Sequence, residues 1–351
     1  MAILTNNVLT LADYATRLGP DGTLAPLINM VSQNNEVLED MLWMEGNLPT
    51  GHKTTQVVGI PQASWRLLNY GVPYVKGQTA SVTDTTAMLE AYTKTDKKLV
   101  DLASNPAGFR LGEESIVIQG MSIQMASALF YGNNQANPAM FTGLAPRYST
   151  VNTGTAPNAA NVLDAGGTGS DNTSIWLVVW GQNSITGIYP KGSQAGLQHE
   201  DVTTNAPVLD AAGNPYQAYQ SHYMWDCGIS LRDWRYVVRI ANISIAALKA
   251  GTGPNLIDLM IQAVNLPPVM PSGAGNVQGT AGDGGRAAPV TMGRAAIYCN
   301  RTVATWLQIA FRKERTAFTS VETVMGRTIT SFEGIPIRKT DALLNTEARV
   351  V

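Results

Sequence analysis

The stretch GEESIVIQGMSIQMASALFYGN, residues 112–133, predicts the strongest helix of the chain. Apolar residues occupy most of its circumference, and small residues between them permit close approach by other elements. Glu113 and Glu114 favour a helix start, because acidic side chains stabilise the N-terminal end of the helix dipole. Gly132 ends the run. The pattern therefore predicts a buried or nearly buried spine over residues 113–131.

The sequence before this helix predicts elements that have no obvious core of their own. Residues 1–50 favour two amphipathic helices, the first capped by Thr10 and the second running to Met41. Residues 51–92 are of β type and predict a long hairpin, with strands over 52–58 and 78–87 and an elaborated tip. An isolated hairpin is marginally stable, so it should lie against a neighbour.

The sequence after the helix alternates loops, strands and helices. The expected elements are a surface loop over 150–172, strands within 174–189 and 223–245, a helix opened by Pro254, a Gly-rich mobile loop over 271–289, a strand over 295–298, a helix capped by Thr302 and a hairpin over 326–339. This mixture of segregated helices and strands indicates an α+β fold.

Composition excludes several classes of protein. The chain has 351 residues and a net charge of -2, which argues against a general DNA-binding protein. Only 14% of residues are charged, against about 25% in ordinary soluble domains, so partners are expected to cover much of the surface.

Cys227 and Cys299 are too few for a disulfide framework or a cysteine-rich zinc site, and each is expected to be a small buried residue. No secretory signal or apolar stretch of membrane-spanning length is present, which indicates a soluble protein made in a cytoplasm.

Searches for catalytic motifs are mostly negative, and no catalytic, cofactor or metal residue is assigned. The fragment Gly251-Thr252-Gly253 begins like a dinucleotide fingerprint, but Leu256 occupies the position of the third glycine. The run His199-Glu200-Asp201 is the only local cluster of metal-capable side chains, and a solvated turn is the preferred interpretation.

Two further patterns of charged residues lie beside the aromatic residues of 223–245. Asp226 and Asp233 would lie about 23 Å apart on a strand, which exceeds the separation of paired glycosidase carboxylates. Arg232, Arg235 and Arg239 are expected to offer exposed or inter-subunit charge, and base stacking beside them is the weaker interpretation.

Four blocks of the sequence carry a family resemblance: EVLEDMLWMEGNLPTGHKTT (36–55), VTDTTAMLEAY (82–92), GEESIVIQGMSIQMASALFYGN (112–133) and SIWLVVWGQNSITGIYPKGSQAGLQHEDV (174–202). They resemble the major capsid proteins of short-tailed double-stranded DNA phages, in particular the epsilon-fifteen type branch. The resemblance covers nearly the whole chain, and the blocks are conformational motifs without catalytic residues.

The resemblance implies the tailed-phage capsid fold of the Hong Kong ninety-seven type. It implies an N-terminal arm over 1–50, an extended E-loop over 51–93, a peripheral domain over 94–249 with its spine helix at 112–133, and an axial domain over 250–351. The order of axial and peripheral elements differs from that of the prototype, which implies rearranged connectivity. Inter-subunit contacts are expected from the arm and from the hairpin, namely from Leu11, Tyr14, Leu18, Trp65 and Tyr70.

The function implied is a non-enzymatic shell subunit that uses no cofactor. Its expected partners are copies of itself in pentamers and hexamers, neighbouring capsomers, a cement or decoration protein, a separate scaffolding protein, the portal and weakly bound double-stranded DNA, with no membrane. Its expected location is the virion, after assembly in the host bacterial cytoplasm. The alternatives are a carbohydrate-binding or glycoside-active soluble protein, which the aromatic content would allow, and a nanocompartment shell protein of the same fold.

Overall fold

The computed structural model describes residues 35–351 except 104, 152–153, 155, 204–206, 211, 269–293, 315–318 and 325–326. The backbone alone is described within 312–330. The chain divides into two compact units. The first includes residues 88–125 and 196–226, and the second includes residues 35–87, 126–195 and 227–351. The predicted N-terminal helix that carries Leu11, Tyr14 and Leu18, and the predicted mobile loop over 271–289, lie outside the described residues.

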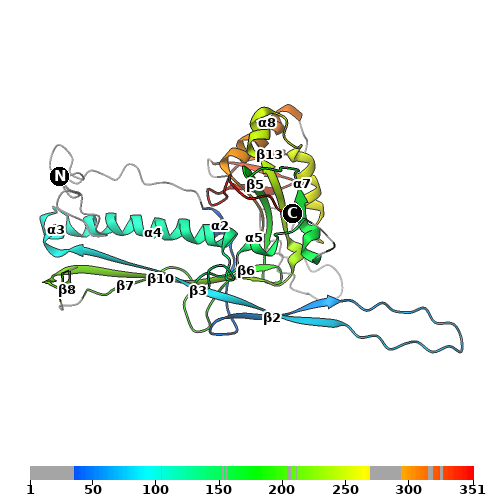
Figure 1. Cartoon of the computed structure of the whole chain (residues 1–351), viewed down its shortest axis with the longest axis horizontal. Helices are drawn as coiled ribbons and strands as arrows, with labels where there is room; N and C mark the ends of the chain where they lie inside the picture. Colours follow the sequence, from blue (N-terminus) through cyan, green and yellow to red (C-terminus); the bar gives the residue numbers. More distant parts are fainter. Residues whose placement is uncertain are drawn as a thin grey trace. The chain divides into compact units, whose positions relative to one another are not determined.

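The first unit packs one long helix against a sheet (Figure 1). Its elements are the second half of β3 (Gln78–Asp96), α3 (Lys97–Leu102), most of α4 (Pro106–Tyr131), β7 (Gln198–Asp201), β8 (Val208–Leu209), β9 (Pro215–Tyr216) and the first half of β10 (Ala218–Leu231). Strands β7 and β10 are antiparallel, with Ser221 opposite Asp201. Leu99, Val100 and Phe109 form a small core between α3 and α4.

Helix α4 confirms the predicted spine but differs from the prediction in two respects. It begins at Pro106, so Glu113 and Glu114 do not lie in its first turn. Phe109 and the C-terminal turns are well buried, whereas Leu111 is 66% exposed and Ile116 is 43% exposed. The apolar circumference predicts burial, whereas part of it is exposed among the described residues.

The second unit is built around strand β5 (Asn172–Trp180), which is buried over its whole length. β5 pairs antiparallel with β11 (Val237–Ser244) on one side and with β12 (Arg294–Cys299) on the other. β12 pairs in parallel with β15 (Ile335–Lys339), and β14 (Arg327–Phe332) and β13 (Thr319–Val324) continue the sheet. The sequence predicts strands within 174–189, and β5 confirms this prediction. The predicted closing hairpin over 326–339 is confirmed by the pairing of β14 with β15.

Two layers cover the two faces of β5, because alternate residues of a strand point to opposite sides. Ile175, Leu177 and Val179 belong to a core that includes α6 (Ile245–Ala250), α7 (Leu256–Asn265) and α8 (Arg301–Glu314). On the other face, the ring of Trp176 lies 6.0 Å from that of Tyr148 and 6.2 Å from that of Phe130. These three aromatic side chains therefore belong to the core.

The helix starts in this unit differ from the predicted ones by one or two residues. α7 is capped by Asn255, whose side chain accepts a hydrogen bond from the Ile257 amide, so Pro254 precedes the cap. The side chain of Asn300 accepts from the Thr302 amide at the start of α8, so Thr302 is not the cap. Gly251 ends α6 in the left-handed conformation, which explains the glycine-rich fragment without any cofactor.

A second group of strands joins the base of the hairpin to the body of this unit. β1 (Trp43–Glu45) pairs in parallel with β6 (Ile185–Tyr189), and residues 228–231 of β10 pair antiparallel with β6. β2 (Gly51–Gly59) pairs with β3 from Thr85 to Gln78, which confirms the predicted hairpin. Figure 1 shows this hairpin as a long two-stranded ribbon.

Three other predictions of secondary structure were wrong. The helix expected to reach Met41 is only α2 (Val37–Asp40) in the described residues, and a strand follows it. The expected loop over 150–172 contains η1 (Pro157–Asn161) and β4 (Val162–Asp164), which pairs with β11. The run His199-Glu200-Asp201 lies in strand β7 and not in a turn. In each segment a strand forms by pairing with residues that are distant in the sequence, and local sequence does not encode such pairing.

Short helical segments complete the chain: α5 (Leu144–Arg147) and η2 (Trp234–Tyr236). Asp233 caps η2 and therefore does not continue strand β10. The expected boundary between the peripheral and axial domains lies between residues 249 and 250. Strands of the central sheet come from both sides of this boundary, because β5 and β11 precede it and β12 and β15 follow it. None of the described helices is both long enough and apolar enough to span a membrane.

Candidate functional site

The most exposed apolar surface of the second unit is the tip of the hairpin, residues 60–77. Trp65 and Tyr70, both predicted as contact residues, lie on it and are exposed. Its other large exposed apolar side chains are Ile60, Leu67, Leu68, Val72, Tyr74 and Val75. Sequence reasoning missed these six, although their density in a stretch rich in Gly and Pro was the available signal. Monomeric proteins rarely expose so many apolar side chains together unless a partner covers them.

Local hydrogen bonds shape this tip. The Tyr70 amide donates to the carbonyl of Leu67 at 3.2 Å and closes a tight turn. Asn69 has a φ of 67°, a left-handed conformation that Asn tolerates better than most residues. Arg66 donates from Nε to the Tyr70 carbonyl oxygen at 2.9 Å. The tip therefore has a defined conformation at the turn, although its large apolar side chains are exposed among the described residues.

The base of the hairpin is anchored by a buried carboxylate. Asp84 is 3% exposed, forms an ion pair with Arg147 at 2.8 Å and accepts from the Leu231 amide at 3.1 Å. Gln56 donates to the carbonyl oxygen of Leu231 at 2.8 Å. A Cβ atom on Gly51 would lie 2.0 Å from the Asp84 carbonyl oxygen, so only glycine permits this close approach. The exposed tip thus extends from a fixed root.

His52 lies beside this root and is 7% exposed. Its Nε2 atom is 2.9 Å from the Arg232 guanidinium. Burial and the nearby positive charge of Arg232 lower the pKa of His52 below its ordinary value, so the neutral imidazole is favoured in the folded state. Arg232, for which exposed or inter-subunit charge is expected, is partly buried here.

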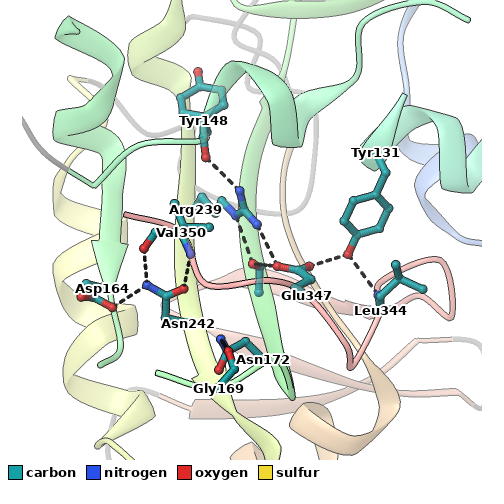
Figure 2. A network of polar contacts seen from close by, with 11 residues as sticks. Tyr131, Tyr148, Asp164, Gly169, Asn172, Arg239, Asn242, Leu344, Glu347 and Val350 are labelled. Carbon is teal, nitrogen blue, oxygen red and sulfur yellow. Dashed lines mark hydrogen bonds and ion pairs between the residues drawn. The ribbon is translucent and has the colours of Figure 1, made fainter. Parts of the chain in front are cut away.

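A buried network holds the C-terminal segment of the chain against β5 and β11 (Figure 2). Arg239 is 4% exposed and pairs with Glu347 at 2.7 Å, and it also donates to the Ser174 hydroxyl and to the Tyr148 carbonyl oxygen. The prediction of an exposed or inter-subunit Arg239 is therefore wrong. The Tyr131 hydroxyl donates to the other carboxylate oxygen of Glu347.

A second contact fixes the end of the same segment. The side-chain amide of Asn242 donates to the Val350 carbonyl oxygen, and its carbonyl oxygen accepts from the Val350 amide, both at 2.8 Å. The same amide nitrogen donates to Asp164 at 2.8 Å (Figure 2). Residues 340–351 thus form a C-terminal strap that closes over the sheet.

A third network fixes the segment that follows the undescribed N-terminal residues. Asp40 pairs with Arg294 at 2.9 Å and with Arg338 at 3.3 Å, and it accepts from the Tyr298 hydroxyl at 3.0 Å. Burial is the largest influence on Asp40 and raises its pKa, against the attraction of the two arginines. Asp40 is therefore fixed to β12 and β15 of the second unit.

The remaining candidate residues have structural partners. Arg235 pairs with Asp233 at 2.7 Å on the surface. Both cysteines are buried, and burial raises the pKa of the Cys299 thiol to about 12. Among the described residues, no group of three His, Cys, Asp or Glu side chains converges as a metal site.

The chain belongs to the major capsid protein GP7 family, whose family model matches residues 19–351. The solved structure of bacteriophage Epsilon15 contains a chain with 33% sequence identity and a TM-score of 0.74, and the match covers 100% of this chain and 99% of that one. The fold is accordingly the α+β, Hong Kong ninety-seven type of phage capsid proteins. No curated protein matches the chain.

More distant solved structures also match. The capsid of a native GTA particle has 10% identity, a TM-score of 0.45 and coverage of 68% of this chain and 99% of that one. An encapsulin complex from Synechococcus elongatus PCC 7942 has 12% identity, a TM-score of 0.41 and coverage of 67% and 97%. These two similarities are too weak to carry a conclusion. The protein is a phage major capsid protein, a structural component of the virion that assembles into capsomers. The carbohydrate-binding and nanocompartment alternatives receive no support.

Proposed function

We propose that this chain forms pentamers and hexamers that close an icosahedral head around double-stranded DNA. The single observation that carries the proposal is the exposed apolar tip of the hairpin, which has no partner within the described residues of one chain. In this arrangement the hairpin is the E-loop (51–93), and residues 1–50 are the arm. Residues 94–249 and 250–351 are the peripheral and axial domains.

The hairpin supplies enough apolar surface to join neighbouring subunits. Trp65, Tyr70 and Tyr74 are exposed, and aromatic side chains of this size bury about 150–250 Å² each. At about 25 cal/mol per Å², covering all three contributes about 11–19 kcal/mol before the costs of association. Those costs are roughly 4–15 kcal/mol, so one hairpin gives a modest net contact. A closed shell with many such contacts is stable through multivalency, without covalent cross-links.

The remaining partners follow from the same role. The portal, a separate scaffolding protein and a cement or decoration protein would bind assembled capsomers. DNA would contact the shell weakly, because a net charge of -2 offers little counterion release. The shell subunit would perform no catalysis, would hold no cofactor and would assemble in the host bacterial cytoplasm.

Sedimentation followed by negative-stain imaging tests this proposal. The expressed full-length chain, with its scaffold if one is required, is expected to give a fast fraction of shells, capsomer rings or tubes. The double variant Trp65→Ser/Tyr70→Ser should stay folded by circular dichroism and lose closed shells. Leu209→Ser, which changes an exposed apolar residue away from the tip, is the matched control. Normal shells from the double variant would overturn the role of the hairpin.

A truncation tests the arm separately. Removing residues 1–20, which include Leu11, Tyr14 and Leu18, should leave a folded subunit that fails to form stable shells. Particles of normal yield and shape from this truncation would contradict the assignment of an inter-subunit arm.

A further inference from the structure

Arg232, which follows β10 at the root of the hairpin, has no carboxylate partner among the described residues. Its Nη2 atom lies 2.9 Å from the Nε2 atom of His52 and 3.6 Å from the sulfur of Met44. Its Nε atom is buried and has no hydrogen-bond partner in the described part of the chain. A buried donor without an acceptor is unfavourable, so the side chain is incompletely satisfied.

The charges around Arg232 do not neutralise it. Asp84, whose charge also acts on His52, pairs with Arg147 at 2.8 Å. Burial and the charge of Arg232 lower the pKa of His52, which favours the neutral ring. Two arginines, one aspartate and a neutral imidazole leave an excess of positive charge in a partly buried cluster. A negative charge brought to this cluster would therefore neutralise it.

The ring of His52 faces a hydrogen-bond donor at both of its nitrogen atoms. The Asn47 amide donates to Nδ1 at 3.2 Å, and the Arg232 guanidinium faces Nε2. A neutral imidazole has one N–H group and one acceptor nitrogen, so it cannot accept both hydrogen bonds. With Nδ1 as the acceptor, the Nε2–H group points at the N–H groups of Arg232. An oxygen atom placed between the two side chains would accept from both.

A carboxylate meets these requirements. The Nε and Nη2 atoms form one edge of the planar guanidinium, and a carboxylate accepts two parallel hydrogen bonds from such an edge. It would also accept from the Nε2–H group of His52. Assembly brings copies of the chain together, and each copy has 26 acidic residues. The backbone of duplex DNA is a poorer candidate, because its phosphates bind exposed cations and Arg232 is partly buried.

We infer that Arg232 and His52 form a socket for one carboxylate, which an Asp or Glu side chain of a second copy supplies on assembly. The inference rests on the proposed assembly and adds an ionic contact at the root of the hairpin, apart from its apolar tip. The socket and its ligand are different surfaces of the chain, so the contact is heterologous. Heterologous contacts generate rings when the rotation between copies closes.

Arg232→Met separates a role in assembly from a role in folding. Met keeps an apolar stem and removes the charge and its donors. Because Arg232 has no carboxylate partner in the described subunit, the unassembled variant should melt within about 3 °C of the unmodified protein or above it. The subunit concentration at which full-length, nucleic-acid-free protein first forms shells, with scaffold if required, should rise by about tenfold or more. An unchanged assembly concentration, or a larger fall of the melting temperature, would overturn the inference.

Arg235→Met is the matched control, because Arg235 is the next arginine of the chain and already pairs with Asp233 on the surface. It should assemble at the concentration of the unmodified protein. Arg232→Glu should need a higher concentration than Arg232→Met, since it repels an incoming carboxylate. Assembly of Arg232→Glu as good as that of Arg232→Met would contradict the entry of an anion.

A second-site experiment identifies the carboxylate. In the Arg232→Glu background, each Asp and Glu that is not buried is replaced singly by Arg. One of these replacements should restore shells by exchanging the signs of the pair, and the same replacement alone should impair assembly. If every folded double variant still fails to assemble, the second copy does not supply the carboxylate and the inference is refuted.

The hairpin variant distinguishes the socket from the proposed function. If Trp65→Ser/Tyr70→Ser loses shells and Arg232→Met does not, the apolar tip joins subunits and the socket is refuted. If Arg232→Met impairs assembly and the hairpin variant does not, the socket stands and the apolar tip does not carry assembly.

Discussion

Replacing Arg239 by Met should strongly destabilise the subunit by freeing the C-terminal strap. Met keeps the length of the apolar stem and its packing near Trp176, whose ring centroid lies 5.0 Å from the guanidinium carbon. The substitution removes donors to Glu347, Ser174 and the Tyr148 carbonyl oxygen. It leaves the Glu347 carboxylate buried without its cation, which typically costs about 3–5 kcal/mol.

A surface pair with the same geometry provides the control. Arg235 and Asp233 are also 2.7 Å apart, but their side chains are 53% and 20% exposed, against 4% and 5% for Arg239 and Glu347. Solvent screens the exposed pair, so Arg235→Met should cost about 0–1 kcal/mol. The two substitutions therefore compare a buried ion pair, with its additional hydrogen bonds, with an exposed ion pair of the same N···O distance.

The free energy of unfolding is measured on unassembled subunits by urea titration with tryptophan fluorescence. At an m value of about 2–3 kcal/mol per M, the midpoint for Arg239→Met should fall by about 1–2.5 M. The midpoint for Arg235→Met should fall by less than about 0.5 M. Arg239→Met/Glu347→Leu should recover much of the loss, because the unpaired charge is gone.

Equal midpoint shifts for the two arginine variants would refute this reasoning. A double variant that is less stable than Arg239→Met would also contradict it, because the loss could not then be attributed to an uncompensated carboxylate.

Three further predictions follow from local geometry. The unfolded state takes up a proton at His52 near pH 6.5, whereas the folded state has a lower pKa for this group. The free energy of unfolding should therefore fall as the pH drops from 7 to 5. His52→Gln should flatten this part of the pH profile of urea midpoints. Gly187→Ala would place a Cβ atom 2.8 Å from the Trp43 ring and should destabilise the subunit by about 1–3 kcal/mol. At Gly120, an exposed helical position, an added Cβ atom meets nothing within 4 Å, so Gly120→Ala should stabilise the subunit by about 0.5–1 kcal/mol. Urea unfolding measures both changes. Cys227 and Cys299 should resist alkylation in the native subunit and react on unfolding, and rapid native labelling of either thiol would contradict their burial.

Local sequence predicted the elements whose pattern is self-contained. The strands of the hairpin follow from a run of Thr, Val and Gln, and the spine helix follows from apolar residues at helical spacing. Trp65 and Tyr70 were placed on the tip because a stretch rich in Gly and Pro separates the two strands. The family followed from extended blocks of similar residues, which local propensity does not supply.

Other features depend on partners that are distant in the sequence. β1 forms because Trp43–Glu45 pairs with Gly187–Tyr189, and nothing within residues 36–46 indicates a strand. Helix α4 begins at Pro106, where the segment Pro106-Ala107-Gly108 gives a weak start signal, and contacts with β10 support its early turns.

The sequence by itself determined the class of protein, the hairpin, the spine helix and the buried cysteines, because periodicity, composition and family blocks are local or cumulative signals. The tertiary structure alone decided that Arg239 is buried, since its partner Glu347 is 108 positions away and a charged residue on a strand otherwise favours water. It also decided which side chains share a face of the sheet in the first unit, because strand register determines whether Tyr92, His222 and Glu200 lie on one side.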